Sequence, residues 1–189
     1  MIAAAAELFA EHGYGGTTMS RIAKAAGVSP ETVQAHGPKA ALIVAAFEYV
    51  SFGVTGAEQN ILELDVGQQF AAIGDRDAAV AFMCDATIEV HGSGVGVWRA
   101  LTGAATSDPE LDGYLVELIA GMRTQSDRVL GVCRDRGWVR DDVPFGELAE
   151  WTSVITGIEV YDRMVARDRV PVDAYRRWFI SALHALVLR

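Results

Sequence analysis

The chain has 189 residues, of which 51% are hydrophobic, so it is long enough for one large helical domain or for a small domain attached to a larger one. Its formal net charge of −9 argues against non-specific nucleic-acid binding by the chain as a whole. It has no apolar run of about 18 residues, so we expect no membrane span, and its N-terminus lacks the basic start of a signal peptide. Residues 1–45 contain three basic and three acidic side chains, so the excess negative charge lies beyond them.

Apolar residues at helical spacing predict four helices in the first part of the chain. The first covers residues 2–12 and ends at Gly13, and the second covers 19–26, with Thr17 or Thr18 as its N-cap. Ser29 and Pro30 form an N-cap and N1 pair for a short third helix, which residues 37–38 (Gly-Pro) must end. A fourth, apolar helix runs from Lys39 to about residue 54.

The remainder of the chain also favours helices. We expect a loop with a short helix over 55–74 and a helix over 77–90, with a kink or a new start at the glycines near residue 94 and a further piece over 97–105. The pair Asp108–Pro109 opens a long helix that ends at Gly137. Two last helices cover 145–168 and 172–189. The predicted fold class is all-α, with about nine helices in total.

Three residues carry the most specific pattern, namely Ala23, Gly27 and Val33. A helix-turn-helix needs a small residue where its helices cross, a residue that tolerates positive φ in the turn, and an apolar residue that anchors the second helix. The alternative is simply two packed helices joined by a glycine turn. In a DNA-binding helix-turn-helix the outer face of the second helix enters the major groove. The expected DNA contacts on that face are Glu31, Thr32, Gln34, Ala35 and His36. Backbone N–H groups at the helix starts of Thr18 and Ser29 suit phosphate, and Lys39 at the start of the fourth helix is placed for a phosphate contact.

The stretch ELFAEHGYGGTTMSRIAKAAGVSPETVQAHGPKAAL closely resembles the N-terminal domain of the TetR (tetracycline-repressor) family of transcriptional regulators, over residues 1–48. Residues 157–188 resemble the end of the TetR-type regulatory domain. The resemblance implies a three-helix DNA-binding domain over 1–45 and a larger helical domain for ligand binding and dimerisation over 46–189. It also implies a cytoplasmic homodimer that binds a palindromic double-stranded operator, and a small-molecule effector that releases it.

The sequence departs from the family pattern around its reading helix. Family members commonly have TVYxHFxxK, whereas here the Tyr position is Gln34, the Phe is missing, and one residue fewer separates His36 from Lys39. Many relatives have a basic arm before the first helix, and this sequence has none. We therefore expect weaker electrostatic binding and a shallower salt dependence than in a more basic relative.

The larger predicted domain offers candidates for an apolar pocket and a dimer face, although core packing is the alternative for each residue. The pocket candidates are Phe82, Met83, Trp98, Leu118, Met122, Trp151 and Ile155. Because family members pair their last two helices across the dimer, the interface candidates are Val154, Ile158, Tyr161, Phe179, Leu183 and Leu186. The effector is expected to be apolar, and His91 is expected on the surface or facing a loop.

Other chemistries find little support. The carboxylates of Asp85 and Glu89 share a helix face, but no further ligand completes a metal site, so none is assigned. The sequence shows no hydrolase, zinc-protease or P-loop motif, so we expect no catalytic residue and no cofactor. Cys84 and Cys133 are expected to be buried free thiols. The alternative function is a helical ligand-binding or protein-interaction protein whose sequence-specific DNA binding is weak or lost.

Overall fold

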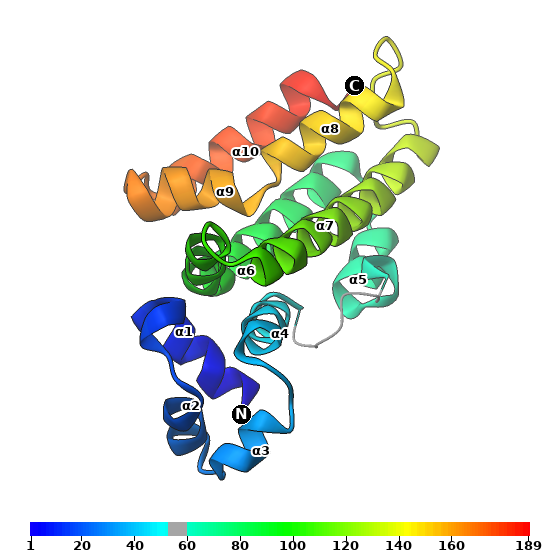
Figure 1. The fold of residues 1–189 in the computed structure, drawn as a ribbon. Helices are drawn as coiled ribbons and strands as arrows, with labels where there is room; N and C mark the ends of the chain where they lie inside the picture. The colour runs from blue at the N-terminus through cyan, green and yellow to red at the C-terminus, as the bar shows by residue number, and fades with distance from the viewer. Residues whose placement is uncertain (53–59) are drawn as a thin grey trace. The chain divides into compact units, whose positions relative to one another are not determined.

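The computed structural model describes residues 1–52 and 60–189, and within these ranges it is helical (Figure 1). These residues form no strand, and Val139 and Leu188 form an isolated antiparallel bridge. The all-α prediction is therefore confirmed. The predicted end of the fourth helix near residue 54 and the predicted start of the following loop at residue 55 lie outside the described residues.

The chain divides into two compact units that do not follow the order of the sequence. The first unit comprises Met1–Ala57 and Gly92–Ala120, and the second comprises Glu58–His91 and Gly121–Arg189. The functional boundary after residue 45 stays a prediction. None of the described helices is both long and apolar enough to cross a membrane.

The first unit contains the helices expected from the N-terminal sequence. Its elements are α1 (Ile2–Gly16), α2 (Met19–Ala26), α3 (Pro30–Gln34), α4 (Lys39–Phe52), the later part of α6 (Arg76–Ala105) and the start of α7 (Pro109–Asp135). Their apolar faces meet in a core that includes Phe9, Ile22, Val33, Leu42 and Phe47, each at most 2% exposed. Burial of side chains of this size is the main stabilising contribution to such a unit.

The link between α1 and α2 uses both threonines of its Thr-Thr pair. Gly13 interrupts α1 with a φ of +69°, which glycine adopts without steric cost. The buried hydroxyl of Thr17 lies 2.9 Å from the carbonyl oxygens of Leu8 and Gly13 at this break. Thr18 is the N-cap of α2, because its hydroxyl accepts a hydrogen bond from the backbone N–H of Arg21 at 3.2 Å. The predicted choice between the two threonines is thus resolved in favour of Thr18.

The predicted break at the glycines near residue 94 is wrong, because α6 runs through them from Arg76 to Ala105. Gly96 lies where α1 approaches α6 closely. A Cβ atom at Gly96 would lie 2.7 Å from the Cβ of Ala10, which is too short for any real contact. Glycine at this position therefore reflects helix packing, and the tertiary contact outweighs the low helix propensity of the residue.

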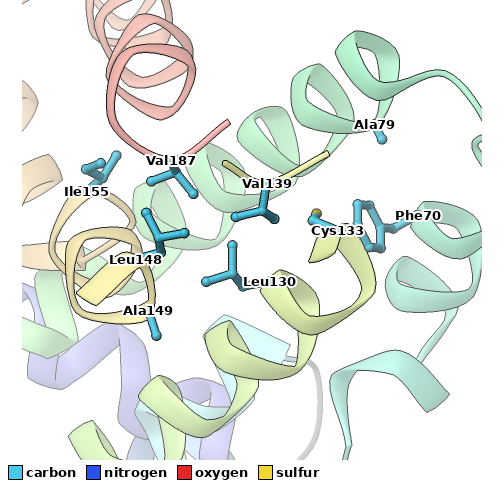
Figure 2. Packing of buried hydrophobic residues seen from close by; sticks show 9 residues of the cluster. All are labelled: Phe70, Ala79, Leu130, Cys133, Val139, Leu148, Ala149, Ile155 and Val187. Carbon is cyan, nitrogen blue, oxygen red and sulfur yellow. The ribbon is translucent and has the colours of Figure 1, made fainter. Parts of the chain in front are cut away.

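The second unit is built around a nine-residue apolar cluster. Its elements are η1 (Ile61–Glu63), α5 (Asp65–Ala72), the first part of α6, the later part of α7, α8 (Phe145–Ile155), α9 (Ile158–Tyr161), the π-helix η2 (Asp162–Arg167) and α10 (Val172–Leu186). Figure 2 shows the cluster: Phe70, Ala79, Leu130, Cys133, Val139, Leu148, Ala149, Ile155 and Val187. Burial raises the pKa of both cysteine thiols, Cys84 and Cys133, to about 11, so these free, buried side chains stay protonated.

Helix boundaries set by local sequence match the predictions in this unit, with one exception. Gly137 has a φ of +71° just beyond α7, and α10 begins directly after Pro171. The single helix predicted over 145–168 is wrong, because Thr156 and Gly157 separate α8 from α9. Gly157 has an extended ψ of 141°, and a Cβ there would lie 3.2 Å from the carbonyl oxygen of Ser153. A side chain at this position would therefore press against the backbone of the preceding turn.

Candidate nucleic-acid interface

The turn between α2 and α3 has the geometry that the three-residue pattern predicts. Ala23 is 2% exposed on α2, and Val33 is fully buried on α3. Between them, Gly27 adopts the left-handed conformation with φ +68° and ψ 28°, and the N–H of Val28 donates to the carbonyl oxygen of Ala23 at 3.1 Å. Val33 therefore anchors α3 against the core of the first unit, and the glycine makes the tight turn possible.

The start of α3 is held by a side-chain cap. Ser29 is the N-cap, and its Oγ accepts a hydrogen bond from the N–H of Thr32 at 3.2 Å. The hydroxyls of Ser29 and Thr32 also lie 3.1 Å apart. The Ser29 hydroxyl further lowers the pKa of the exposed Glu31 carboxylate, which is therefore ionised at neutral pH. Pro30 occupies the first turn, where its missing N–H costs nothing.

The outer face of α3 is polar and open to solvent. Every side chain expected there is exposed, while Val33 between them is buried; the exposed set is Glu31, Thr32, Gln34, Ala35 and His36. The Nδ1 atom of His36 lies 2.9 Å from the carbonyl oxygen of Thr32. Because a carbonyl oxygen only accepts, Nδ1 donates this bond, and the Nε2 atom remains as the ring's second polar position.

The link after α3 explains how the shortened sequence reaches α4. The N–H of Gly37 donates to the carbonyl oxygen of Gln34 at 3.1 Å, and Gly37 itself has a φ of +112°. A residue with a Cβ atom is strained at this φ, so the link requires glycine at this position. The carbonyl oxygen of Pro38 then accepts from the N–H of Leu42 at 3.1 Å, and α4 begins at Lys39.

Lys39 has a partner that the sequence did not reveal. Its Nζ lies 4.0 Å from the centroid of the Tyr14 ring, a cation–π contact, and burial lowers its pKa. Burial also raises the pKa of Tyr14, as do the nearby charges of Asp108 and Glu110 at the start of α7. Tyr14 is thus the residue of this region that the pattern missed. Its only signal was an aromatic residue between two glycines in the α1–α2 linker.

The residues predicted for the ligand pocket fall into both units. In the second unit Phe82, Met83 and Trp151 pack against the cluster that contains Ile155, and Met122 is half-buried. In the first unit Leu118 is buried, and Trp98 packs against Phe47 at a ring-centroid distance of 5.4 Å. Four of the seven therefore belong to, or pack against, one apolar cluster of the second unit.

The predicted interface residues divide by exposure. Val154 on α8 is 68% exposed and Leu186 on α10 is 44% exposed, whereas Leu183 is half-buried. Ile158, Tyr161 and Phe179 are buried within the single chain. Trp178, which the sequence analysis did not select, is 37% exposed on α10.

One polar residue of α6 differs from its sequence-based description, and another has a partner that the sequence did not reveal. The expectation that His91 is surface or loop-facing is wrong: it lies within α6, is 5% exposed, and meets the ring of Tyr161 edge-on at 5.7 Å. Its helix continues past the glycines, so there is no loop for it to face. Asp85 is engaged by Arg176 of α10, whose Nη2 lies 2.9 Å from Oδ2. No group of three potential metal ligands occurs among the described residues.

Comparison with known proteins agrees with this geometry. Residues 1–46 match the model of the bacterial regulatory proteins of the tetR family. No curated protein sequence matches the chain.

Three similar solved structures extend the likeness to the whole chain. A Rhodococcus sp. protein described as a TetR-family transcriptional regulator has a TM-score of 0.77 and 17% identity, with 98% of this chain and 95% of that chain covered. The transcriptional regulator FadR from Bacillus subtilis, in complex with stearoyl-CoA, has a TM-score of 0.73 and 19% identity, with coverages of 98% and 95%. A complex of SmeT with triclosan has a TM-score of 0.70 and 17% identity, with coverages of 100% and 90%. The chain thus resembles the bacterial regulatory proteins of the tetR family in sequence over residues 1–46, and it shares the fold of solved TetR-family regulators over nearly its whole length.

Proposed function

We propose that this protein is a ligand-responsive transcriptional regulator that binds operator DNA through α3. The observation that carries the proposal is the exposed polar face of α3, which the Ser29 cap and the buried Val33 hold in a defined orientation. A short, rigid helix with polar side chains on its outer face is the element that reads base edges in the major groove.

Distinct contact types are assigned to individual residues. Thr32 and Gln34 read base edges, since a threonine methyl can meet thymine and a glutamine can pair bidentately with adenine. The helix starts at Thr18 and Ser29 bind phosphate through backbone N–H groups, and Lys39 binds phosphate through its ammonium group. The remaining exposed residues, Glu31, Ala35 and His36, border the same face.

The proposed binding form is a homodimer on a palindromic operator in the cytoplasm. Exposed apolar side chains on α8 and α10, namely Val154, Trp178 and Leu186, support an interface on these helices. In a two-fold dimer the two copies of α3 would lie about 34–36 Å apart, which is one turn of B-DNA.

The proposed output is repression that an apolar effector relieves. Two proteins of the same fold were solved with stearoyl-CoA, which carries a long apolar acyl chain beside its charged CoA moiety, and with triclosan, which is largely apolar. The apolar cluster of the second unit that contains Ile155, with Phe82, Met83 and Trp151 packed against it, is the proposed lining of the effector site, together with Met122. The effector would act by binding more tightly to a conformation whose half-site spacing misfits the operator.

The test is a salt-titrated binding assay on DNA taken from beside the protein's own gene. Thr32→Ala should relax discrimination between operator and mismatched DNA, at a cost of about 1–3 kcal/mol for the affected base pair. Lys39→Ala should weaken all sequences alike and reduce the salt slope by about one for each subunit, hence by about two for the dimer. Arg177→Ala, which removes one positive charge from an exposed position of α10, is the matched control and should leave both quantities unchanged.

Three outcomes would contradict the proposal or one of its parts. Absence of any sequence preference at low salt would favour the alternative function, a helical ligand-binding or protein-interaction protein. Equal losses from Thr32→Ala and Lys39→Ala on every sequence would refute the division between base and phosphate contacts. Sedimentation as a monomer at micromolar concentration would refute the homodimer.

A further inference from the structure

An aromatic cluster in the second unit contains two buried polar atoms without hydrogen-bond partners. Tyr161 of α9 meets His91 of α6 at a ring-centroid distance of 5.7 Å and Tyr175 of α10 at 5.4 Å, both edge-on. His91 is 5% exposed and Tyr175 is fully buried. Among the described residues, neither Nδ1 of His91 nor the hydroxyl of Tyr175 has a hydrogen-bond partner.

Such atoms ordinarily have a partner, because leaving a buried donor or acceptor unsatisfied destabilises a protein. Two of them beside the same tyrosine ring indicate a place where a further molecule supplies the missing hydrogen bonds. The hydroxyl of Tyr175 can donate and accept, and a neutral imidazole presents one donor and one acceptor. The polar chemistry therefore suits a hydroxyl or carbonyl group.

The surroundings of the two atoms favour an uncharged molecule. Three aromatic rings, those of Tyr161, Trp178 and Phe179, lie within 6.0 Å of the Tyr175 ring centroid. The nearby charges are already matched, because Arg176 binds the carboxylate of Asp85 with an Nη2–Oδ2 distance of 2.9 Å. Burial lowers the pKa of His91 to about 4, so its imidazole is neutral at physiological pH. An ionic ligand would find no counter-charge from the imidazole.

The backbone beside Tyr161 departs from a regular α-helix on both sides. α9 has only four residues, and it lies between the break at Gly157 and the π-helix that begins at Asp162. π-Helical turns are rare and occur frequently at functional sites.

We propose that His91 and Tyr175 form the polar recognition site for an uncharged, apolar ligand that carries one hydroxyl or carbonyl group. The inference rests on the proposed function in that this ligand would be the effector. His91 of α6 and Tyr175 of α10 add the polar contacts that the apolar residues of the cluster containing Ile155 do not supply.

Two probes that differ only in a hydroxyl group test the site: 4-ethylphenol and ethylbenzene. Each is titrated calorimetrically into the full-length protein without DNA. The phenol should bind about tenfold more tightly, which corresponds to one net hydrogen bond of ordinary strength. Tyr175→Phe and His91→Phe should each reduce this preference for the phenol. Tyr114→Phe removes a hydroxyl from a half-buried side chain of α7 and should leave the preference unchanged.

The variants also report on folding. Tyr175→Phe removes only an unpartnered hydroxyl, so its melting temperature should equal or exceed that of the wild type. Equal affinities for the two probes, absence of phenol binding, or a preference that survives in Tyr175→Phe would each overturn the proposal and leave ordered water as the partner of these atoms. Since no DNA is present, these results are independent of whether α3 reads an operator.

Discussion

The close approach of α1 and α6 at Gly96 predicts opposite effects for the same substitution at two glycines of one helix. Gly103→Ala places a methyl group in open space, because nothing lies within 4 Å of the added Cβ. The better helix propensity of alanine should then raise the free energy of unfolding by about 1 kcal/mol. Gly96→Ala has the same gain in propensity but places its Cβ 2.7 Å from the Cβ of Ala10.

The steric cost at Gly96 can be worked from that distance. Carbon atoms in contact prefer a separation of about 3.5–4.0 Å, so the two helices must move apart by roughly 1 Å. Overpacking of this kind costs about 1–3 kcal/mol. Since the propensity term is common to both variants, Gly96→Ala should be less stable than Gly103→Ala by about 1–3 kcal/mol.

Urea unfolding followed by circular dichroism measures this difference, with equal m-values required for the comparison. The double variant Ala10→Gly with Gly96→Ala removes one of the two clashing methyl groups, so its stability should exceed the sum of the single effects by more than about 0.5 kcal/mol. If both glycine variants stabilise the protein equally, or the double variant is strictly additive, α1 and α6 do not approach closely at this point and the reasoning is refuted.

Three further predictions concern the anchor of α3, the start of α7 and the buried histidine. Val33→Ala should lower the free energy of unfolding by about 2 kcal/mol, because Val33 is fully buried. Val28→Ala, at an exposed position, should change this free energy little, and urea titration measures both variants. Asp108→Ala should cost about 1 kcal/mol, since its Oδ1 accepts from the N–H of Glu110 at 3.1 Å and of Leu111 at 3.3 Å; an unchanged melting temperature would disprove the cap. Burial lowers the pKa of His91 from 6.5 to about 4, so between these values the unfolded chain binds a proton that the folded chain does not, and stability falls as the pH falls. At 1.36 kcal/mol for each pKa unit, His91 should lower the free energy of unfolding by about 3 kcal/mol between pH 6.5 and pH 4. Urea titrations at each pH should show this fall in His12→Gln and should not show it in His91→Phe.

Much of the fold follows from the sequence because helix ends depend on a few neighbouring residues. Ser29 with Pro30 caps α3, and Asp108 with Pro109 starts α7, as the sequence predicted. Gly27 takes the positive φ that the turn requires. These features involve hydrogen bonds and backbone angles within a few positions, so the residue types themselves specify them.

The sequence could not decide the features that depend on contacts between distant segments. Gly96 was expected to break a helix, yet it permits the approach of Ala10 within a continuous α6. His91 was expected outside and is buried against Tyr161, and Lys39 was expected to be free for phosphate and lies over the ring of Tyr14. In each case the partner lies far along the chain, so neither periodicity nor capping rules identify it.

The same limit applies to the apolar residues of α8 and α10. Helical spacing predicted that Val154 and Ile158 share an apolar face, but it could not decide that Val154 is 68% exposed and Ile158 fully buried. The break at Gly157 separates them, in a turn where the glycine lies close to the backbone of the preceding turn. Thus the sequence determined the helix-turn-helix, its caps and the all-α class through local rules, whereas which side chains face solvent or the core was decided by tertiary packing.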